Sequence, residues 1–422
     1  MTRPSPTTGS ARIGLGFREF VITIALMTAS IALAIDSMLP ALPAIAGALG
    51  VPNPNDAQLV ISVYFLGFGL AQLIFGSLAD AFGRRPILLL GLAIFVLTSL
   101  GAAWTESFGA LLVFRFAQGI GGAAIRITTT AITRDCFGGR EMARVMSYIM
   151  IVFMLVPILA PSFGQAVLLY GGWHWIFLLL GLVGAVLLVW AGMRMRESLP
   201  VTERLPLSVA AITGGFRTVL TNRITCGYMI GLTVFTAVIC TFVVTVQQIF
   251  GTVYGLGDWL PIAFAGTASG IAVANFANGY FVRRFGMRRI SHACMLAFTA
   301  LSVIAFGMAL AGTPPFLFTY LMISLILMFF AAIATNFTAI CLEPMGHIAG
   351  TATAVTGFVS TTGGAILGGL IGQMFDGTVR PLFGGFALFG LISILAILWA
   401  ERGHLFTHPG DEPALEPGMG GH

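Results

Sequence analysis

Long, continuous apolar stretches constrain this chain more than any other feature of its sequence. Twelve of them are long enough to cross a hydrocarbon core about 30 Å thick as helices. They lie at residues 19–42, 57–79, 86–104, 109–132, 145–170 and 174–193, and then at 224–248, 259–282, 290–312, 315–340, 348–374 and 382–400. The predicted fold class is an all-α, polytopic membrane protein.

Composition excludes several classes of protein. Only 9% of the residues are charged, against roughly 25% in soluble domains. The first apolar stretch runs past Pro40 without a small-residue cleavage site, which favours a retained span over a signal peptide. The chain has no Lys, so it lacks a phosphate-binding loop for ATP. Its cysteines show no C-x-x-C spacing and its histidines lie near the predicted surfaces, so we expect no metal, no cofactor and no enzymatic activity.

The chain divides into two similar halves. The segment "FGSLADAFGRRPI" (75–87) returns as "NGYFVRRFGMRRI" (278–290), 203 residues later. The longest polar interruption separates six spans from six. We therefore predict two pseudo-symmetric six-helix bundles, an arrangement common in secondary transporters. The expected boundaries are a tail at 1–18, a bundle at 19–193, a linker at 194–223, a bundle at 224–400 and a tail at 401–422.

Arginine placement predicts the orientation. With the N-terminus inside, 18 of the 21 arginines fall in cytoplasmic segments, two lie in the fourth span, and Arg380 alone lies outside. Basic loops remain in the cytoplasm. Both tails and the linker are therefore expected to be cytoplasmic, and the basic net charge indicates topology instead of binding to nucleic acid.

A buried carboxylate in the first span is the main functional candidate. Asp36 lies about 24 Å above the cytoplasmic end of its span, and Arg115 lies about 8 Å below the outer end of the fourth span. In a core about 30 Å thick the two groups reach nearly the same level. A charge in hydrocarbon is costly, so each should face water or the other. Arg115 favours the ionised carboxylate and a dry surrounding favours the neutral form, so we interpret Asp36 as a proton carrier tuned by Arg115. The alternative is a static pair that joins spans one and four.

One face of the fourth span carries further polar or small residues. The spacing i, i+3, i+4, i+7 and i+11 places Gln118, Gly119, Gly122 and Arg126 on the face of Arg115. Arg126 lies near the cytoplasmic mouth. It could reach the interface, pair with Glu343 or attract an anionic substrate, and the first two are favoured.

Three other polar side chains at mid-membrane depth are weak candidates for the lining of a substrate cavity. Many Phe and Met residues with few charges suit small, largely apolar compounds. The candidates are Tyr64, Gln247 and Asn336.

The loop "GSLADAFGRRPI" after the second span combines Gly76, Asp80, Gly83, Arg84 and Arg85. It resembles the signature loop of the major facilitator superfamily. Gly76 would allow close helix approach, and Asp80 would lie at the N-terminus of span eleven when the cytoplasmic side is closed. The alternative is a solvated turn that carries positive-inside charges.

Other stretches extend this resemblance. "IDSMLPALPAI", "RFAQGIGGAA", "VPILAPSFGQAV" and "AGTATAVTG" make the chain similar to twelve-span drug:proton antiporters of that superfamily, especially the Bcr/CflA group. The resemblance implies proton coupling by Asp36 and Arg115. It also implies an antiporter motif with Pro157, Pro161 and Gly164, for which an ordinary proline-bent helix is the alternative. Gln165, Ser37, Met38 and Arg126 depart from the family pattern.

The expected function is therefore export of a small amphipathic drug or antibiotic in exchange for protons, by a monomer in the bacterial inner membrane. The partners are a small-molecule substrate, protons and the lipid bilayer. The alternative is export of an anionic or neutral metabolite, with Arg115 and Arg126 as substrate ligands.

Overall fold

The computed structural model describes residues 13–204 and 209–406, and within these residues it contains helices and no strand. Twelve helical segments are long and apolar enough to cross a membrane, which confirms the predicted all-α fold with twelve spans. The N-terminal half contains α2 (Phe17–Asp36), α3 (Leu42–Ala48), α4 (Leu59–Phe82), α5 (Arg84–Ala103), α6 (Phe108–Cys136), α7 (Gly139–Gly171) and α8 (His174–Arg194). The C-terminal half contains α10 (Arg223–Gln248), α11 (Leu260–Phe285), α12 (Met287–Ala311), α13 (Phe316–Leu342), α14 (Ala349–Gln373) and α15 (Arg380–Ala400).

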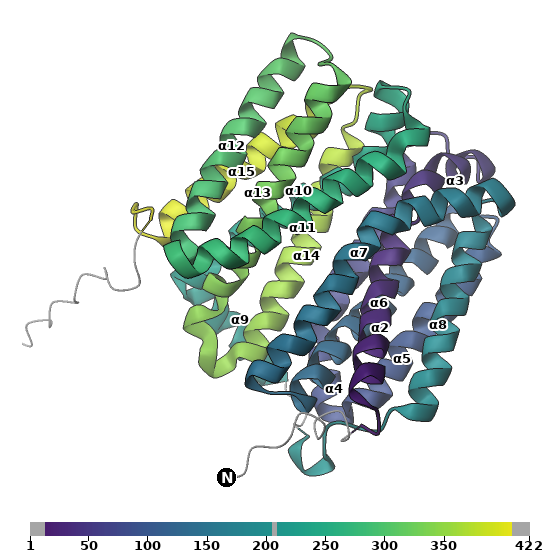
Figure 1. The fold of residues 1–422 in the computed structure, drawn as a ribbon, viewed down its shortest axis with the longest axis vertical. Coiled ribbons are helices and arrows are strands. Elements are labelled where there is room, and N and C mark those ends of the chain that lie inside the picture. Colours follow the sequence, from purple (N-terminus) through teal and green to yellow (C-terminus); the bar gives the residue numbers. More distant parts are fainter. Residues whose placement is uncertain (1–12, 205–208, 407–422) are drawn as a thin grey trace, which may run out of the picture.

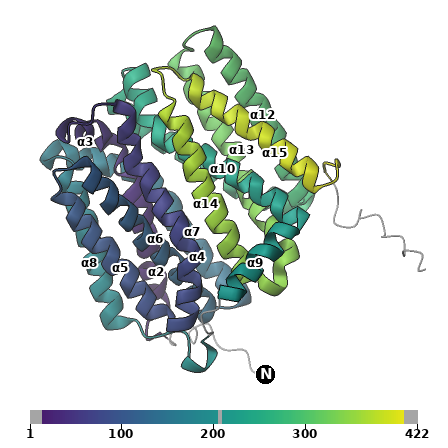
Figure 2. The same cartoon turned by 180° about the vertical axis from the view of Figure 1, so that it is seen from behind.

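The two halves lie side by side as separate bundles (Figure 1, Figure 2). Within the first, α6 packs on α4 and α5, while α2 packs on α7. Within the second, α10 packs on α14 and α15, while α12 packs on α13 and α15. Two helix pairs, α4 with α14 and α7 with α11, form most of the interface between the halves.

The segment between the halves contains a helix that the sequence did not predict. We expected a linker at 194–223, and α9 (Val209–Thr221) occupies part of it. This helix contacts α10 and α14. A Cβ atom on Gly215 would lie 2.2 Å from the side chain of Thr351, so the approach of α9 to α14 depends on the missing side chain.

The same turn closes the second span of each half. Gly83 follows α4 with φ of 104°, and Gly286 follows α11 with φ of 81°. Both values lie in the region that favours glycine. The repeat predicted from segments 75–87 and 278–290 therefore includes this backbone conformation.

The first span differs from the continuous helix predicted at 19–42. Helix α2 ends at Asp36, a 3-10 turn η1 (Leu39–Ala41) follows, and α3 then continues to Ala48. Pro40 and Pro43 have no N–H group, so neither can continue the α-helical hydrogen-bond ladder of α2. The sequence did not reveal this break because the apolar run continues past Pro40.

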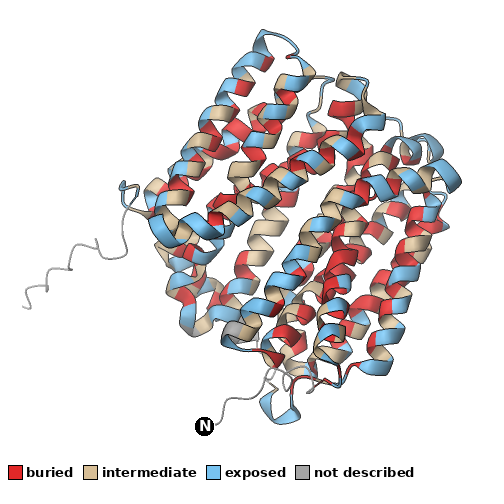
Figure 3. Cartoon of the chain, viewed as in Figure 1, coloured by how far each residue is buried: buried red, intermediate tan, exposed pale blue. Residues whose placement is uncertain are grey.

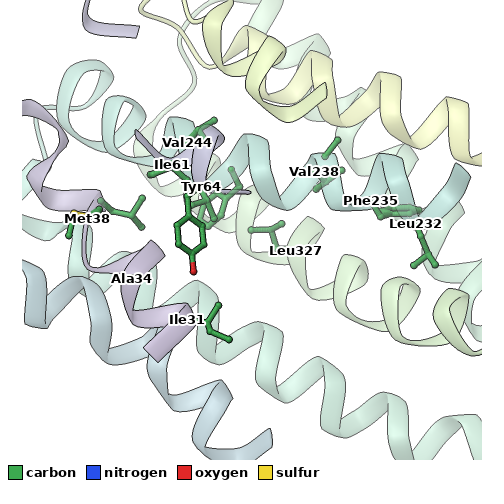
Figure 4. Close-up of a cluster of buried hydrophobic side chains, with 14 of the residues drawn as sticks. Ile31, Ala34, Met38, Ile61, Tyr64, Leu232, Phe235, Val238, Val244 and Leu327 are labelled. Carbon is green, nitrogen blue, oxygen red and sulfur yellow. The ribbon is translucent and has the colours of Figure 1, made fainter. Parts of the chain in front are cut away.

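Buried residues concentrate inside each bundle and exposed residues on the outward faces (Figure 3). The larger of two apolar clusters extends through both halves. Figure 4 shows part of it, with Tyr64 of α4 among side chains from the first span, α10 and α13. The cluster keeps the two bundles in contact around the candidate site.

The molecule has two opposite ends. The arginine-rich face contains the start of α2, the 83 and 286 turns, the segment 195–222 and the end of α15. The far face contains residues 37–58 and 374–379, together with the connection between α10 and α11.

Candidate functional site

The break after Asp36 creates a binding position for Arg115. Met38 N–H donates to the Ile35 carbonyl instead of to Ala34, at 3.4 Å. The Ala34 carbonyl accepts from Nη1 of Arg115 at 3.0 Å. The last carbonyl groups of a helix lack backbone partners and carry partial negative charge. Arg115 therefore caps the C-terminal end of α2.

The Asp36 carboxyl lies in the same region with no comparable partner. Its residue is 6% exposed. Among the described residues, it makes no hydrogen bond to the side chain or backbone of another residue and forms no ion pair within 4.0 Å with Arg115 or any other cation. Tyr64 lies within electrostatic range of both Asp36 and Arg115. The two groups predicted at one level thus share a neighbour and are not directly paired in this conformation.

Arg115 is fully buried and nearly fully coordinated. Its Nε donates to the Val60 carbonyl at 2.8 Å, and Nη1 donates to Oε1 of Gln118 at 2.6 Å. Its guanidinium carbon lies 4.6 Å from the centre of the Tyr64 ring, a cation–π geometry. Nη2 has no partner in the described part of the chain. The cation is held in place by backbone and amide oxygens, and one donor remains unused.

Gln118 connects Arg115 to the neighbouring helix. Its Nε2 donates to Oγ of Ser99 at 2.6 Å, and Ser99 donates to the Phe95 carbonyl at 2.6 Å. This chain of hydrogen bonds runs from α5 through α6 to the end of α2. It orients the guanidinium, because each partner is itself fixed by another bond.

Glycines on α6 bring it against α4. A Cβ atom on Gly119 would lie 2.1 Å from the Tyr64 carbonyl, and one on Gly122 would lie 2.7 Å from the Tyr64 hydroxyl oxygen. The Tyr64 hydroxyl is buried without a hydrogen-bond partner among the described residues. The predicted fourth-span face therefore surrounds Tyr64 instead of lining an open surface at this level.

The fifth span packs on the break after Asp36. Pro157 and Pro161 both lie inside α7, which is one helix from Gly139 to Gly171. A Cβ atom on Gly164 would lie 2.1 Å from the Ser37 carbonyl. Only glycine allows this approach, so the candidate antiporter motif lies directly against the residue that follows Asp36.

A group of amide side chains joins the halves at the far face. We call Asn55, Gln58, Gln248 and Gln373 the far-face amide cluster. Gln58 contacts Gln248 across the interface. Gln248 donates to Oδ1 of Asn55 at 2.8 Å, and Gln373 donates to the Asn55 carbonyl at 2.8 Å. Asn55 in turn donates to the Phe375 carbonyl at 2.8 Å. Every one of these bonds links the N-terminal half to the C-terminal half.

The contact between α4 and α14 ends before the arginine-rich face. Gln72 donates to Oγ1 of Thr361 at 2.9 Å. Beyond this contact, Cβ atoms on Gly76 and Gly350 would each have no neighbour within 4 Å. All five ion pairs among the described residues lie within one half. The halves are thus joined at the far face and not by charge at the arginine-rich face.

The signature loop forms a compact cluster within the N-terminal half. Arg84 pairs with Asp80 and, at 3.2 Å, with Asp135. The Glu197 carboxylate accepts from the backbone N–H groups of Arg84 at 2.9 Å and Arg85 at 3.1 Å. These are the first residues of α5, so the carboxylate binds at a helix N-terminus. Sequence reasoning placed Asp80 at the start of span eleven and missed Glu197, which lies in the predicted linker.

Gly83 is required by this arrangement. A Cβ atom on it would lie 2.5 Å from Oε2 of Glu197, and its φ is positive. Arg85 also donates to the Gly192 carbonyl at 2.7 Å, which attaches the loop to α8. The loop residues therefore stabilise one another and the end of α8.

Arg126 is the exception among the fourth-span residues. Among the described residues, its guanidinium has no hydrogen bond or ion pair, and its one aromatic contact is Phe153 of α7, with 5.6 Å between guanidinium carbon and ring centre. Glu343, a predicted partner, pairs with Arg288 at 3.2 Å.

The two remaining cavity candidates have different surroundings. Asn336 is buried and donates to Oδ1 of Asn278 at 2.8 Å, within the C-terminal half. Gln247 is partly exposed and close to Gly251, while the neighbouring Gln248 belongs to the far-face amide cluster. Adjacent residues on a helix point about 100° apart, which is why the sequence did not distinguish them.

Similarity to known proteins covers most of the chain. The profile of the Major Facilitator Superfamily matches residues 24–368. A bicyclomycin resistance protein homolog of Haemophilus influenzae is 30% identical over 387 residues, covering 89% of this chain and 94% of that protein. The multidrug resistance protein MdtL of Escherichia coli is 27% identical over 376 residues, covering 87% and 92%.

A solved structure shares the fold. It is a bacterial homolog to the human lysosomal transporter Spinster in an inward-facing and unoccupied conformation, with a TM-score of 0.68 and 16% identity. The match covers 92% of this chain and 95% of that one.

Proposed function

The chain belongs to the Major Facilitator Superfamily and is a multi-pass membrane transporter of small molecules, not an enzyme; from this premise we propose that it exports a small amphipathic compound in exchange for protons. Relatives named for bicyclomycin and multidrug resistance support a drug or antibiotic as the substrate. The transporter works by alternating access and acts as a monomer.

The proposed site of action is the bacterial inner membrane. The placement of 18 arginines on one side supports a cytoplasmic arginine-rich face, with both termini on that side. The far face is then periplasmic. Contacts at the far-face amide cluster, and the open space at Gly76 and Gly350, support a state that is closed to the periplasm.

The observation that carries the proposal is the buried, unpartnered carboxyl of Asp36. An ionised carboxylate in a dry site without a hydrogen-bonding partner is strongly unfavourable, so this conformation suits the neutral carboxylic acid. The group thus holds a proton while the far face is closed. Arg115 cannot neutralise it here, because backbone and amide oxygens already coordinate the guanidinium.

Exchange follows from a change in this surrounding. Entry of the substrate from the cytoplasm brings polar groups and water to the end of α2, which favours release of the proton from Asp36. Opening of the far face then exposes the carboxylate to the periplasm, where it binds the next proton and the substrate leaves. The unused Nη2 donor of Arg115 is available to the carboxylate in the ionised state.

Two motif groups support the cycle in this proposal. Gly164 keeps α7 against Ser37 and so limits water access beside Asp36. Asp80, Arg84, Arg85, Gly76 and Gly83 hold the cytoplasmic end of the N-terminal half as one unit that rocks against the other half. Asp80 can exchange Arg84 for the N-terminus of α14 when the cytoplasmic side closes.

A susceptibility panel in an efflux-deficient bacterium tests this function. Wild-type protein is expected to raise the inhibitory concentration of at least one amphipathic antibiotic. Asp36→Asn, expressed and inserted equally, should confer no resistance, while Asp258→Asn, an exposed carboxylate at the far face, should behave as wild type. Resistance that persists in Asp36→Asn would contradict proton coupling by Asp36, and a panel without any resistance would contradict drug export.

A further inference from the structure

Arg126 is a charged side chain inside the membrane-crossing part of α6, and the proposed proton-coupling mechanism gives it no role. It lies ten residues before the end of α6, well inside a segment that crosses the membrane. A charged side chain inside a membrane normally pairs with another group or marks a ligand path. Arg115, on the same helix, has three oxygen partners, whereas Arg126 has none among the described residues.

Four carboxylates near the arginine-rich face contact other arginines. Asp80 and Asp135 contact Arg84. Glu343 and Glu401 contact Arg288, at 3.2 Å and 3.0 Å. Glu141 on α7 has Oε2 without a hydrogen-bond partner, but it lies twelve residues, about 18 Å along the helix, before Phe153, the ring that Arg126 contacts. Because no described carboxylate pairs with Arg126, an anion from outside these residues can compensate its charge.

Arg126 lies at the level where the two halves begin to separate. Gly119 of α6 packs between Tyr64 and Phe68 of α4. Seven residues further along two parallel helices, Arg126 is level with α4 just past Gln72, the last α4 side chain bonded to α14. A ligand that enters between the halves from the arginine-rich face therefore meets Arg126 before it meets Tyr64.

The chemistry around the guanidinium defines the ligand. A guanidinium offers paired N–H donors that fit a carboxylate, sulfonate or phosphate in two parallel bonds. The Phe153 ring lies 5.6 Å from its carbon and supplies an apolar surface beside the charge. Gly122, one turn earlier on α6, has no side chain, and a Cβ atom there would lie 2.7 Å from the Tyr64 hydroxyl oxygen.

We propose that Arg126 is an anion-binding subsite in the substrate path and that the exported compounds include amphipathic molecules with one acidic group beside an aromatic or apolar body. This inference rests on the proposed export function and specifies its substrate class. Arg115 is not a substrate ligand in this conformation, because its side chain is fully buried and its Nε and Nη1 already donate to protein oxygens. Of the two arginines that the metabolite alternative names as substrate ligands, only Arg126 is therefore retained.

Binding of a matched pair of probes tests the inference without a proton gradient. The probes are 1-naphthoate and 1-naphthamide, which share the ring system and differ in charge. In purified protein in phosphatidylcholine nanodiscs, wild type should bind 1-naphthoate about tenfold more tightly, because charge-assisted hydrogen bonds are stronger than neutral ones. Arg126→Gln should lose this preference and keep its affinity for 1-naphthamide, while Arg126→Lys should retain part of it.

Arg134→Gln is the matched control, because it makes the same chemical change at an exposed position of the same helix. It should bind both probes as wild type does. Equal binding of the two probes by wild type, or an unchanged preference in Arg126→Gln, would overturn the inference.

A second arm distinguishes a transported anion from a lipid phosphate. Nanodiscs that contain phosphatidylglycerol should leave 1-naphthoate binding unchanged. If this lipid suppresses 1-naphthoate binding in wild type but not in Arg126→Gln, the site binds lipid and the substrate inference fails. Because no arm requires transport, a failure of proton coupling would appear in Asp36→Asn transport assays and not in these affinities.

Discussion

The two halves repeat the same fold but place their charged groups at different depths. None of the α-helices of the C-terminal half, α10 to α15, contains an Asp or Glu, and Asp258, Asp376 and Arg380 lie at the far face. Its described ion pairs, formed by Arg288, lie at the arginine-rich face. There, Glu401 accepts from Tyr228 at 2.8 Å and from Arg288 at 3.0 Å. The N-terminal half instead buries Asp36 and Arg115 inside its spans and leaves Nη2 of Arg115 without a partner among the described residues.

This difference indicates a division of work. Satisfied polar groups at a helix end stabilise a bundle and gain nothing from a change of protonation. An unpaired carboxyl beside a capped helix end has an unfavourable ionised state, so its protonation depends on conformation. We therefore expect proton coupling to depend on the N-terminal half and the C-terminal half to act mainly as the counterpart of the rocking motion.

Substitution of Asp36 should reduce transport more than any other change proposed for this protein. Asp36→Asn should abolish substrate uptake driven by a pH gradient in inverted membrane vesicles, because the amide cannot carry a proton. Asp258→Asn in the C-terminal half should leave the rate unchanged. Equal inhibition by both substitutions would remove the distinction between the halves.

Arg115 and Arg380 each donate a hydrogen bond to a carbonyl group near the end of a helix. Arg115 donates to Ala34 near the end of α2, and Arg380 donates to the Ala309 carbonyl near the end of α12, at 3.1 Å. Arg115→Ala should destabilise the protein by about 2 to 4 kcal/mol, since buried charged hydrogen bonds are lost. Arg380→Ala, at an exposed position, should cost less than about 1 kcal/mol. Thermal unfolding in detergent measures both, and equal losses would contradict the role assigned to Arg115.

The far-face amide cluster predicts a smaller shift of the conformational equilibrium. Gln248→Ala removes the hydrogen bonds to Asn55 and to the Pro54 carbonyl, together with the contact with Gln58. If these contacts stabilise the closed far face by about 1 kcal/mol, their loss should raise the population of the open state about fivefold. Alkylation of Ser62→Cys from the periplasm, in a background without other cysteines, measures this opening. Gln247→Ala is the control, and an equal acceleration there would show that the cluster does not hold the far face closed.

The contacts of Tyr228 at the arginine-rich face of the C-terminal half should affect stability and not coupling. The Tyr228 hydroxyl contacts Glu401 and Nε2 of His292. Tyr228→Phe should lower the unfolding free energy by about 1 to 2 kcal/mol and leave the pH-gradient dependence of transport as in wild type. Tyr320→Phe is a matched control. A changed proton-to-substrate ratio in Tyr228→Phe would extend the coupling machinery into this half.

The sequence alone predicted the features that follow from the length of its apolar segments. The twelve spans and their all-α fold follow directly from the hydrophobic runs, and depth counting placed Asp36 and Arg115 in one region. Depth counting could not reveal that α2 ends at Asp36, because it assumes that each span is one continuous α-helix. That break supplies the Ala34 carbonyl that Arg115 binds in place of the carboxylate.

Other misses have local causes. Glu197 is one acidic residue in a polar segment, and no spacing rule connects it to the start of α5 more than a hundred residues earlier. Gln247 and Gln248 are identical neighbours, so only the three-dimensional contacts identify Gln248 as the residue that joins the halves.

Proton release on substrate binding tests the central claim most directly. Purified protein in weakly buffered detergent solution, with a pH-sensitive dye, is mixed with the compound to which it confers most resistance. Wild type should release protons in proportion to bound compound, and Asp36→Asn should bind the compound and release none. Equal proton release from the two proteins would show that another group carries the proton.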